Sequence, residues 1–450
     1  MSQEVPLCGD RNDSGPHRPE GAEAPVSFKS NLRSVADVLY KGALPLSIAD
    51  AGAKGSAGVI ALLIARFFGP LQFGQYATAL SVCGMFTMIT GIGFEQEFTR
   101  RGSIEKNDIP ANLSLNLLSL AITSAVAYLS IAVFLPFSGY SRDIVIIGFL
   151  AGATLLVLNI HLPFRHLCLM LNKSHVTATI QIIATTTVLG LTVFVIYMKG
   201  SLKFIVLSQL LVAVGVALAW FLWTPKKYFA IRTSGRSVLD FFRNSALFGF
   251  SNMIWVAYFN FDIFLMSLLR PGTEVGIYAG VYRIIAINYV LGMAVANSFT
   301  PILFRKFTSN RKEFARVSRN LVMAMCLIGL LLSLILYSYS GRLVSMIIGE
   351  LYKEGAVIAR ILSLAVTLRL VNFGLCEILT TGNRQRIRVT VEMFMLLSNV
   401  VLNGFLIPLY GGIGAAMATV GSEIILLVGA SLACRKYGLF RFSASVATAG

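Results

Sequence analysis

The stretch "ARFFGPLQFGQYATAL" (residues 65–80) places a Gly-Pro turn between two strongly apolar runs, and "SLLRPGTEVGIYAGVY" (267–282) nearly repeats it. When the two stretches are aligned, three residues coincide at a constant spacing of 202: Gly74 with Gly276, Tyr76 with Tyr278, and Ala77 with Ala279. A second match pairs Asn172 with Asn383, each in the turn after the fourth apolar run of its half. Either match alone would be weak, because Gly, Pro and Asn are common in turns. Together, and in order, they predict two copies of one unit.

The composition is that of a membrane protein. Of 450 residues, 56% are hydrophobic and 13% charged, with a mean hydropathy of +0.74, whereas soluble domains carry roughly a quarter charged residues. Apolar runs near the length of a bilayer-spanning helix recur at 43–68, 74–94, 113–137, 144–164, 176–198, 203–224, 246–269, 275–304, 318–340, 355–381, 389–409 and 412–434. We predict an all-α polytopic membrane protein with about 12 transmembrane helices. A soluble bundle would need polar helix faces, and a membrane barrel would need strands of alternating polarity.

Each copy holds six helices, an even number, so both copies begin on the same side of the membrane. We therefore expect two parallel six-helix lobes related by an axis along the membrane normal. The expected segments are a disordered cytoplasmic tail (1–35), an N-terminal lobe (36–224), a basic cytoplasmic linker (225–242), a C-terminal lobe (243–434) and a second cytoplasmic tail (435–450). The Gly-Pro and Arg-Pro turns are expected to be tight outer hairpins.

The basic residues behind the formal charge of +17 set the orientation of the chain in the membrane. With the N-terminus in the cytoplasm, basic residues gather in the loops on that side, as in 224–244 and 305–319, and are sparse in the opposite loops. This is the positive-inside pattern, so no nucleic-acid partner is needed to explain the charge. The first thirty residues contain no apolar core of a signal peptide. Both termini are expected in the cytoplasm.

Three cations lie near the middle of an apolar run: Lys54, Arg283 and Arg369. Counting the helical rise puts each roughly 14 to 20 Å inside its helix end. Charges at that depth are costly unless they face a partner or a wet cavity. We take these three as candidate substrate-binding residues of a central cavity.

Four further residues are secondary candidates: Asp50, Asp262, Glu423 and Arg66. Each has a plainer interpretation. Asp50 precedes Lys54 by four residues, the spacing of an ion pair on one helix, and Arg66 lies where its side chain can reach the membrane interface. Arg283 and Arg369 could also simply pair with Asp262, Glu377 or Glu423.

No catalytic constellation is present in the sequence. A phosphate-binding glycine loop, a zinc-binding HExxH and a nucleophile elbow are all missing. The six cysteines show no metal-ligand or redox spacing. We expect a transporter with no metal and no cofactor, and not an enzyme; coupling to H⁺ or Na⁺ stays open.

Three passages carry a resemblance to a known family: "IARFFGPLQFGQYATALS" with "GIGFEQEFTRR" (64–101), "EVGIYAGVYRI" with "TPILFRKF" (274–307), and "NGFLIPLYGGIGAAMAT" (403–419). They resemble the Wzx-type oligosaccharide flippases, a polysaccharide transporter branch of the MOP superfamily. That superfamily also contains the MATE exporters and the lipid II flippases. The likeness covers most of the chain after residue 35 and consists of loose patterns, not a unique signature.

The resemblance implies a V-shaped pair of lobes around a cationic cavity, in a MATE-like MOP fold. It further implies that the protein flips an undecaprenyl-diphosphate-linked oligosaccharide across a bacterial cytoplasmic membrane, for a surface polysaccharide such as O-antigen of lipopolysaccharide or an exopolysaccharide. The lipid bilayer and this lipid-linked substrate would be its partners, and a polymerase or glycosyltransferases could join them. The alternatives are a MATE-like cation-coupled drug antiporter, or a non-transport scaffold or polymerase of the same pathway. Mid-depth cations favour an anionic substrate over a cationic drug.

Overall fold

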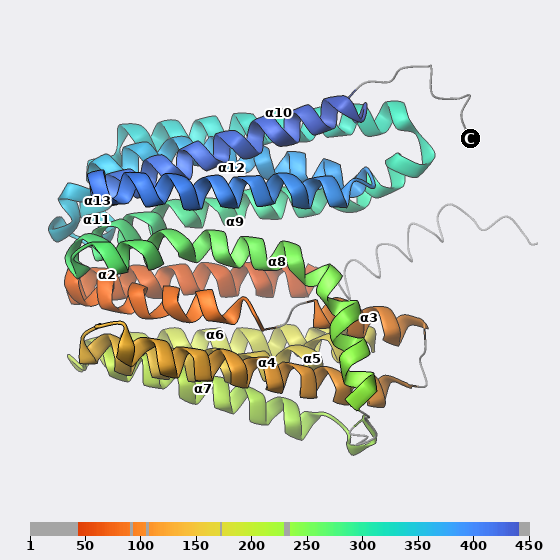
Figure 1. Cartoon of the computed structure of the whole chain (residues 1–450), viewed down its shortest axis with the longest axis horizontal. Coiled ribbons are helices and arrows are strands. Elements are labelled where there is room, and N and C mark those ends of the chain that lie inside the picture. The colour runs from red at the N-terminus through yellow and green to blue at the C-terminus, as the bar shows by residue number, and fades with distance from the viewer. Residues whose placement is uncertain (1–43, 91–92, 105–107, 172, 229–234, 441–450) are drawn as a thin grey trace, which may run out of the picture.

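The computed structural model describes residues 44–440, apart from short gaps at 91–92, 105–107, 172 and 229–234. Two helical bundles lie side by side (Figure 1). The first bundle comprises α2 (Leu44–Thr87), α4 (Ile109–Phe137), α5 (Arg142–Met170), α6 (Ser174–Tyr197) and α7 (Leu202–Trp223). The second comprises α8 (Gly235–Leu269), α9 (Gly272–Ser309), α10 (Arg311–Ser338), α12 (Ala356–Thr381) and α13 (Gln385–Lys436). Short elements complete the fold: α3 (Phe94–Ile104), η3 (Lys226–Tyr228), α11 (Ser340–Ile348) and η4 (Glu350–Gly355).

Within the described part of the chain, 10 helices are long and apolar enough to cross a membrane. Two of them are each a pair of helices joined at a sharp turn, at Gly69 (φ 75°) in α2 and at Gly411 (φ 57°) in α13. A left-handed backbone of this kind favours glycine, which has no Cβ to clash. Counting both halves of α2 and α13, the prediction of about 12 spanning segments is confirmed.

The two bundles together have two distinct ends, the hairpin end and the basic end. The hairpin end carries the Gly69–Pro70 turn inside α2 and the Arg270–Pro271 turn between α8 and α9, so both predicted hairpins are present. The basic end carries the opposite helix termini, where the loop side chains are rich in arginine and lysine. One predicted boundary was wrong: the second span ends at Thr87, not at residue 94, and is followed at the basic end by the separate short helix α3. α3 has four charged residues in eleven, too many for a membrane-spanning segment.

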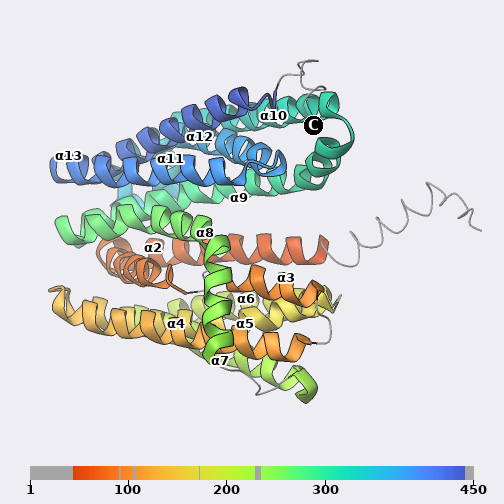
Figure 2. The same ribbon diagram turned by 45° about the vertical axis from the view of Figure 1, so that its right-hand side comes forward.

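The two repeated passages pack against each other at the hairpin end. A Cβ added to Gly74 would lie 2.0 Å from the Gly272 carbonyl oxygen, and a Cβ added to Gly276 would lie 1.8 Å from the Pro70 carbonyl oxygen. The second contact is the counterpart of the first: Gly276 corresponds to Gly74, and Pro70 corresponds to Gly272, each 202 residues apart in the sequence. The bundles therefore meet in a reciprocal, two-fold-like contact that only glycine allows, along the boundary formed by α2 and α9 (Figure 2).

At the basic end, the start of α8 crosses the first bundle before the helix turns into the second (Figures 1 and 2). This part of α8 falls inside the segment predicted to be a linker. Phe241 stacks on Phe94 of α3 with ring centroids 5.7 Å apart, and the Arg101 guanidinium lies 5.2 Å from the Phe241 ring. Nearby, burial raises the pKa of the Glu97 carboxyl, but hydrogen bonds from Arg100 and Arg101 outweigh this and hold the pKa below its usual range. The linker is thus anchored to the first bundle.

Reporter fusions should assign the basic end to the cytoplasm. Fusions after Ser103, Arg232, Ser309 and Gln385 should read cytoplasmic, and fusions after Gly139, Gly200 and Thr273 should read external, because basic loops stay on the cytoplasmic side. Paired alkaline phosphatase and green fluorescent protein reporters would measure this. An external reading at Arg232 would contradict the parallel arrangement of the two repeats.

Candidate functional site

Lys54 and Arg283 lie along the same seam between the bundles. The seam is fixed by Gly58 of α2, whose Cβ position would be 3.1 Å from Ile287 of α9. Lys54 precedes Gly58 by four residues and Arg283 precedes Ile287 by four, so each cation shares the face of its helix that meets the other bundle. Because α2 and α9 run in opposite directions there, the two cations flank the contact, about 12 Å apart along the bundle axis.

Both cations of the seam are available for a ligand. Lys54 is exposed and Arg283 is only partly buried. Among the described residues, no acidic side chain forms an ion pair with either of them. Arg283 directly follows Tyr282 on α9, and Tyr76 lies on the half of α2 that packs against α9 through Gly74 and Gly276. An arginine at mid-depth with no acidic partner, on the same seam as a lysine, suits an anionic group with bidentate oxygen atoms.

Arg369 is placed differently from the other two candidates. Its side chain is 0% exposed, and its Nη2 lies 2.6 Å from Oε1 of Glu423, which is also 0% exposed. Five aromatic rings surround the guanidinium at 4.6 to 5.9 Å: Trp255, Tyr258, Phe259, Tyr289 and Phe373. The structure therefore brings Lys54 and Arg283 to one seam and encloses Arg369 inside the second bundle.

Glu423 is the centre of that enclosed network. It accepts hydrogen bonds from Tyr258 Oη at 2.8 Å and from Asn372 Nδ2 at 2.8 Å, in addition to pairing with Arg369. A buried ion pair needs such further hydrogen bonds to offset the loss of hydration. The geometry is that of the plainer interpretation, in which the arginine pairs with an acid of its own bundle.

Asp50 and Arg66 also have partners other than those suggested by spacing. Asp50 pairs with Arg165 Nη2 of α5 at 2.6 Å and accepts a hydrogen bond from Gln181 of α6 at 2.9 Å. No Asp50–Lys54 ion pair is found among the described side chains, so the local pairing was the wrong interpretation. Arg66 donates to the carbonyls of Met346 and Ile347, the latter at 3.3 Å, at the C-terminus of α11. It therefore joins the two bundles at the hairpin end.

Asp262 is a buried carboxylate surrounded by neutral groups. It accepts hydrogen bonds from Asn403 at 2.7 Å, Thr419 at 2.8 Å and Tyr278 at 2.9 Å, with no basic partner among the described residues. The amide oxygens of Asn399 and Asn403 have no hydrogen-bond donor in this part of the chain. Carboxylate, amide and hydroxyl oxygens are the ligands that hard cations prefer. These residues could therefore hold a proton or an alkali cation.

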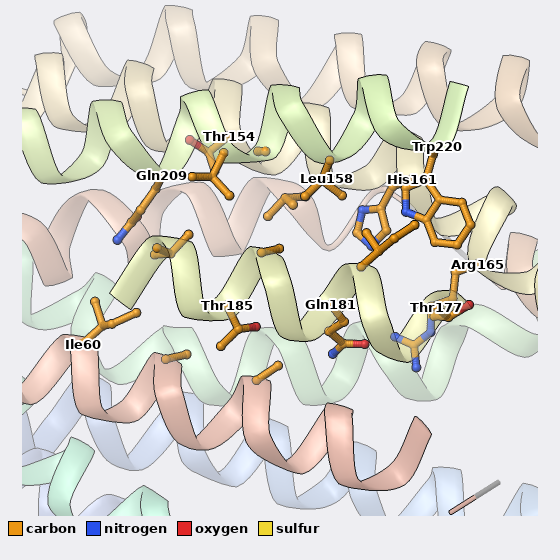
Figure 3. A pocket seen from close by; sticks show the side chains of 18 of the residues that line it. Ile60, Thr154, Leu158, His161, Arg165, Thr177, Gln181, Thr185, Gln209 and Trp220 are labelled. Atoms are coloured by element: carbon orange, nitrogen blue, oxygen red, sulfur yellow. The ribbon is translucent and has the colours of Figure 1, made fainter. Parts of the chain in front are cut away.

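The first bundle encloses a pocket of about 420 Å³ between α2, α5, α6 and α7 (Figure 3). Arg165, His161 and Trp220 lie toward one end of it, and Gln209 and Ile60 toward the other. The sequence had not marked this pocket. Its lining residues are spread over four helices, and the arginine within the apolar run at "HLPFRH" (161–166) was the only local signal in the sequence. The sequence also did not single out Asn399, Asn403 and Thr419, because isolated polar residues on a helix such as α13 carry no distinctive pattern.

Comparison with known proteins agrees with this architecture. Residues 39–307 match the family described as polysaccharide biosynthesis protein, and residues 248–405 match the MatE family. A 155-residue segment, 33% of this chain, is 28% identical to the capsular polysaccharide biosynthesis protein CapF of Staphylococcus aureus and spans 39% of that protein.

Solved structures show the same fold. The inward closed conformation of the lipid II flippase MurJ superposes with a TM-score of 0.71 at 14% identity, over 87% of both chains. An inward-facing multidrug resistance MATE transporter of the MOP superfamily gives 0.63 at 13% identity, over 88% of this chain and 94% of that one. The family model matches more than half of the sequence, and the fold is that of the MOP transporters. The chain therefore belongs to the polysaccharide biosynthesis protein family, as a multi-pass membrane protein whose fold is similar to that of the lipid II flippase and MATE structures.

Proposed function

We propose that the protein flips an undecaprenyl-diphosphate-linked oligosaccharide from the cytoplasmic to the outer leaflet of a bacterial cytoplasmic membrane. The observation that carries this proposal is Arg283, a partly buried arginine at the bundle seam with no acidic partner among the described residues. A diphosphate offers the oxygen pairs that a guanidinium binds in bidentate fashion, and Lys54 adds a second positive charge.

The two-bundle architecture supplies a route for such a substrate. The lipid tail stays in the bilayer while the polar head group follows the seam between α2 and α9. In this conformation the hairpin end is closed by the Gly74 and Gly276 contacts and by Arg66 on the α11 carbonyls. We propose that transport alternates between this state and one in which the hairpin end opens, with the substrate shifting the populations by binding the two states differently.

A MATE-like drug antiporter is the competing function. It would need an unpaired acid in the binding cavity to hold a cationic drug. No acidic side chain lines the first-bundle pocket; Asp50 beside it pairs with the lining residue Arg165, and Asp262 lies enclosed in the second bundle. The free charges at the seam are positive, which favours an anionic substrate.

Replacing Arg283 with glutamine should reduce export about tenfold to a hundredfold, since a hydrogen bond to a charged group contributes about 1.5–3 kcal/mol. Arg283→Lys should restore part of it, because lysine keeps the charge but lacks the planar fork. Surface polysaccharide and membrane abundance would be measured together. Arg360→Gln is the matched control: Arg360 is an exposed arginine of the same bundle whose Nε donates to Ser340 Oγ at 3.0 Å, away from the seam. Full export from a stable Arg283→Gln protein would contradict the proposed diphosphate site.

A further inference from the structure

The pocket of the first bundle differs in charge from the seam beside it. Its lining contains one permanently charged side chain, Arg165, and that charge is balanced by Asp50 at 2.6 Å. The remaining polar lining is neutral: amides, hydroxyls and an imidazole. A diphosphate would find no free cation there, and a cationic drug would find no free acid. The charge balance points to an uncharged ligand.

The polar groups of the pocket are placed to bind hydroxyl groups from several directions. Gln181 and Thr185 project from α6, Gln209 from α7 and Thr154 from α5 (Figure 3). Thr177 Oγ1 and His161 Nδ1 are buried with no hydrogen-bond partner among the described residues. Buried polar atoms are nearly always paired, so these two atoms indicate a ligand or water that completes them.

One wall of the pocket is aromatic. Trp220 is 1% exposed and is held by stacking on Phe164, with ring centroids 6.4 Å apart and planes 11° apart. Although little of the indole surface is accessible, Trp220 contributes to the pocket lining at the end where His161 and Arg165 lie, so apolar and hydrogen-bonding groups are neighbours there. A sugar ring needs both, since its C–H face is apolar and its edge carries hydroxyls. The volume of about 420 Å³ lies within the about 300–1,000 Å³ typical of small-molecule sites.

The pocket is also within reach of the seam. Ala57 of α2 lines the pocket and is itself exposed, and a Cβ on Gly52 or Gly55 would meet no atom within 4 Å. Tyr76, another lining residue, lies on the half of α2 that packs on α9 through Gly74 and Gly276, seven residues before Arg283. A head group whose diphosphate is bound at Arg283 can therefore place a sugar in this pocket.

We infer that this pocket is a subsite for one uncharged sugar residue, a hexose or an N-acetylhexosamine, of the transported oligosaccharide. The inference rests on the proposed function and deepens it. Arg283 and Lys54 hold the charge common to all such lipids, whereas the pocket contacts the part that differs between them. Selectivity for the oligosaccharide then resides in α5, α6 and α7.

The test uses the full-length protein in lipid nanodiscs, with Trp223→Phe and Trp255→Phe so that Trp220 is the only tryptophan left of three. Native lipid-linked oligosaccharide extracted from the source cells should change Trp220 emission saturably. Undecaprenyl diphosphate without sugars should bind without that change. Ala184→Leu, which fills the pocket from α6, should weaken oligosaccharide binding at least about tenfold, or about 1.4 kcal/mol, and leave undecaprenyl diphosphate binding unaltered.

Ala219→Leu is the matched control, because it makes the same change on the exposed face of α7 outside the pocket. It should bind both lipids as the parent protein does. Equal oligosaccharide affinity in the Ala184→Leu and parent proteins would overturn the sugar subsite and leave the proposed function standing. If the parent binds neither lipid, the proposed function fails instead. In that case the pocket is tested with free N-acetylglucosamine. If the sugar leaves Trp220 emission unchanged, the sugar subsite is overturned as well.

Discussion

Replacing Gly276 with alanine is expected to abolish export from a protein that still inserts and folds. The new Cβ would lie 1.8 Å from the Pro70 carbonyl oxygen and 3.0 Å from the Gly74 nitrogen. Both are backbone atoms, so no rotamer change can relieve the clash. Overpacking of this kind costs typically about 1–3 kcal/mol, and here it acts on the closed hairpin end alone. A conformation with that end open escapes the penalty, so the variant should accumulate there and stop cycling.

The symmetry of the contact supplies a second variant and a control. Gly74→Ala meets the Gly272 carbonyl oxygen at 2.0 Å and should behave in the same way. Gly190→Ala places its Cβ where no atom lies within 4 Å and should export normally. Surface polysaccharide, membrane abundance and thermal stability would be measured on all three. Normal export by Gly276→Ala would show that the hairpin end does not close during transport.

Arg369→Gln alone is expected to lower the abundance of folded protein severely. It leaves Glu423, 0% exposed, with an unpaired charge, and breaking a buried pair by removing one partner costs about 3–5 kcal/mol. That is a large share of the about 5–15 kcal/mol by which proteins are stable. Arg369→Gln/Glu423→Gln removes both charges and keeps two side chains of similar size, so abundance should recover. Quantitative blotting of membrane fractions and fluorescence-detected size exclusion would follow it.

The export level of the double variant then tests whether Arg369 contacts the substrate, as its depth in the sequence predicts. An arginine that only pairs with Glu423 gives a double variant that is both stable and active. An arginine that also binds the diphosphate gives a stable but inactive one. Glu423→Gln alone is the reciprocal variant and should be as poorly folded as Arg369→Gln, because it strands the cation inside its aromatic cage.

The fold could be predicted because the membrane imposes it. Every backbone group inside lipid must be satisfied by helix formation, so apolar runs of sufficient length mark the helices, and the Gly69–Pro70 and Arg270–Pro271 turns mark the hairpins. The short helices α3 and α11 escaped prediction. They do not cross the bilayer, so they need no long apolar run, and the apolar pattern of the sequence does not reveal them.

The site was less predictable because its contacts depend on how each helix is rotated about its axis. Lys54 lies one turn from Asp50 along α2, but the carboxylate turns toward Arg165, 115 residues away in the sequence. Arg283 and Arg369 have similar depth and similar apolar neighbours in the sequence. One faces the other bundle, whereas the other is enclosed within its own. Depth can be counted along one helix, but the partner of a charge is set by a second helix.

The reciprocal glycine contact also has the form of an isologous dimer interface. Each half offers the other the same hairpin, in which the carbonyl of Pro70 or Gly272 meets Gly276 or Gly74. An isologous contact of this kind forms between two copies of one unit without any covalent connection between them. The linker between the two bundles then ensures that one copy of each is present, but it is not part of the glycine contact itself. The modern chain, severed between residues 229 and 234 and coexpressed as two polypeptides, should reassemble into a working heterodimer.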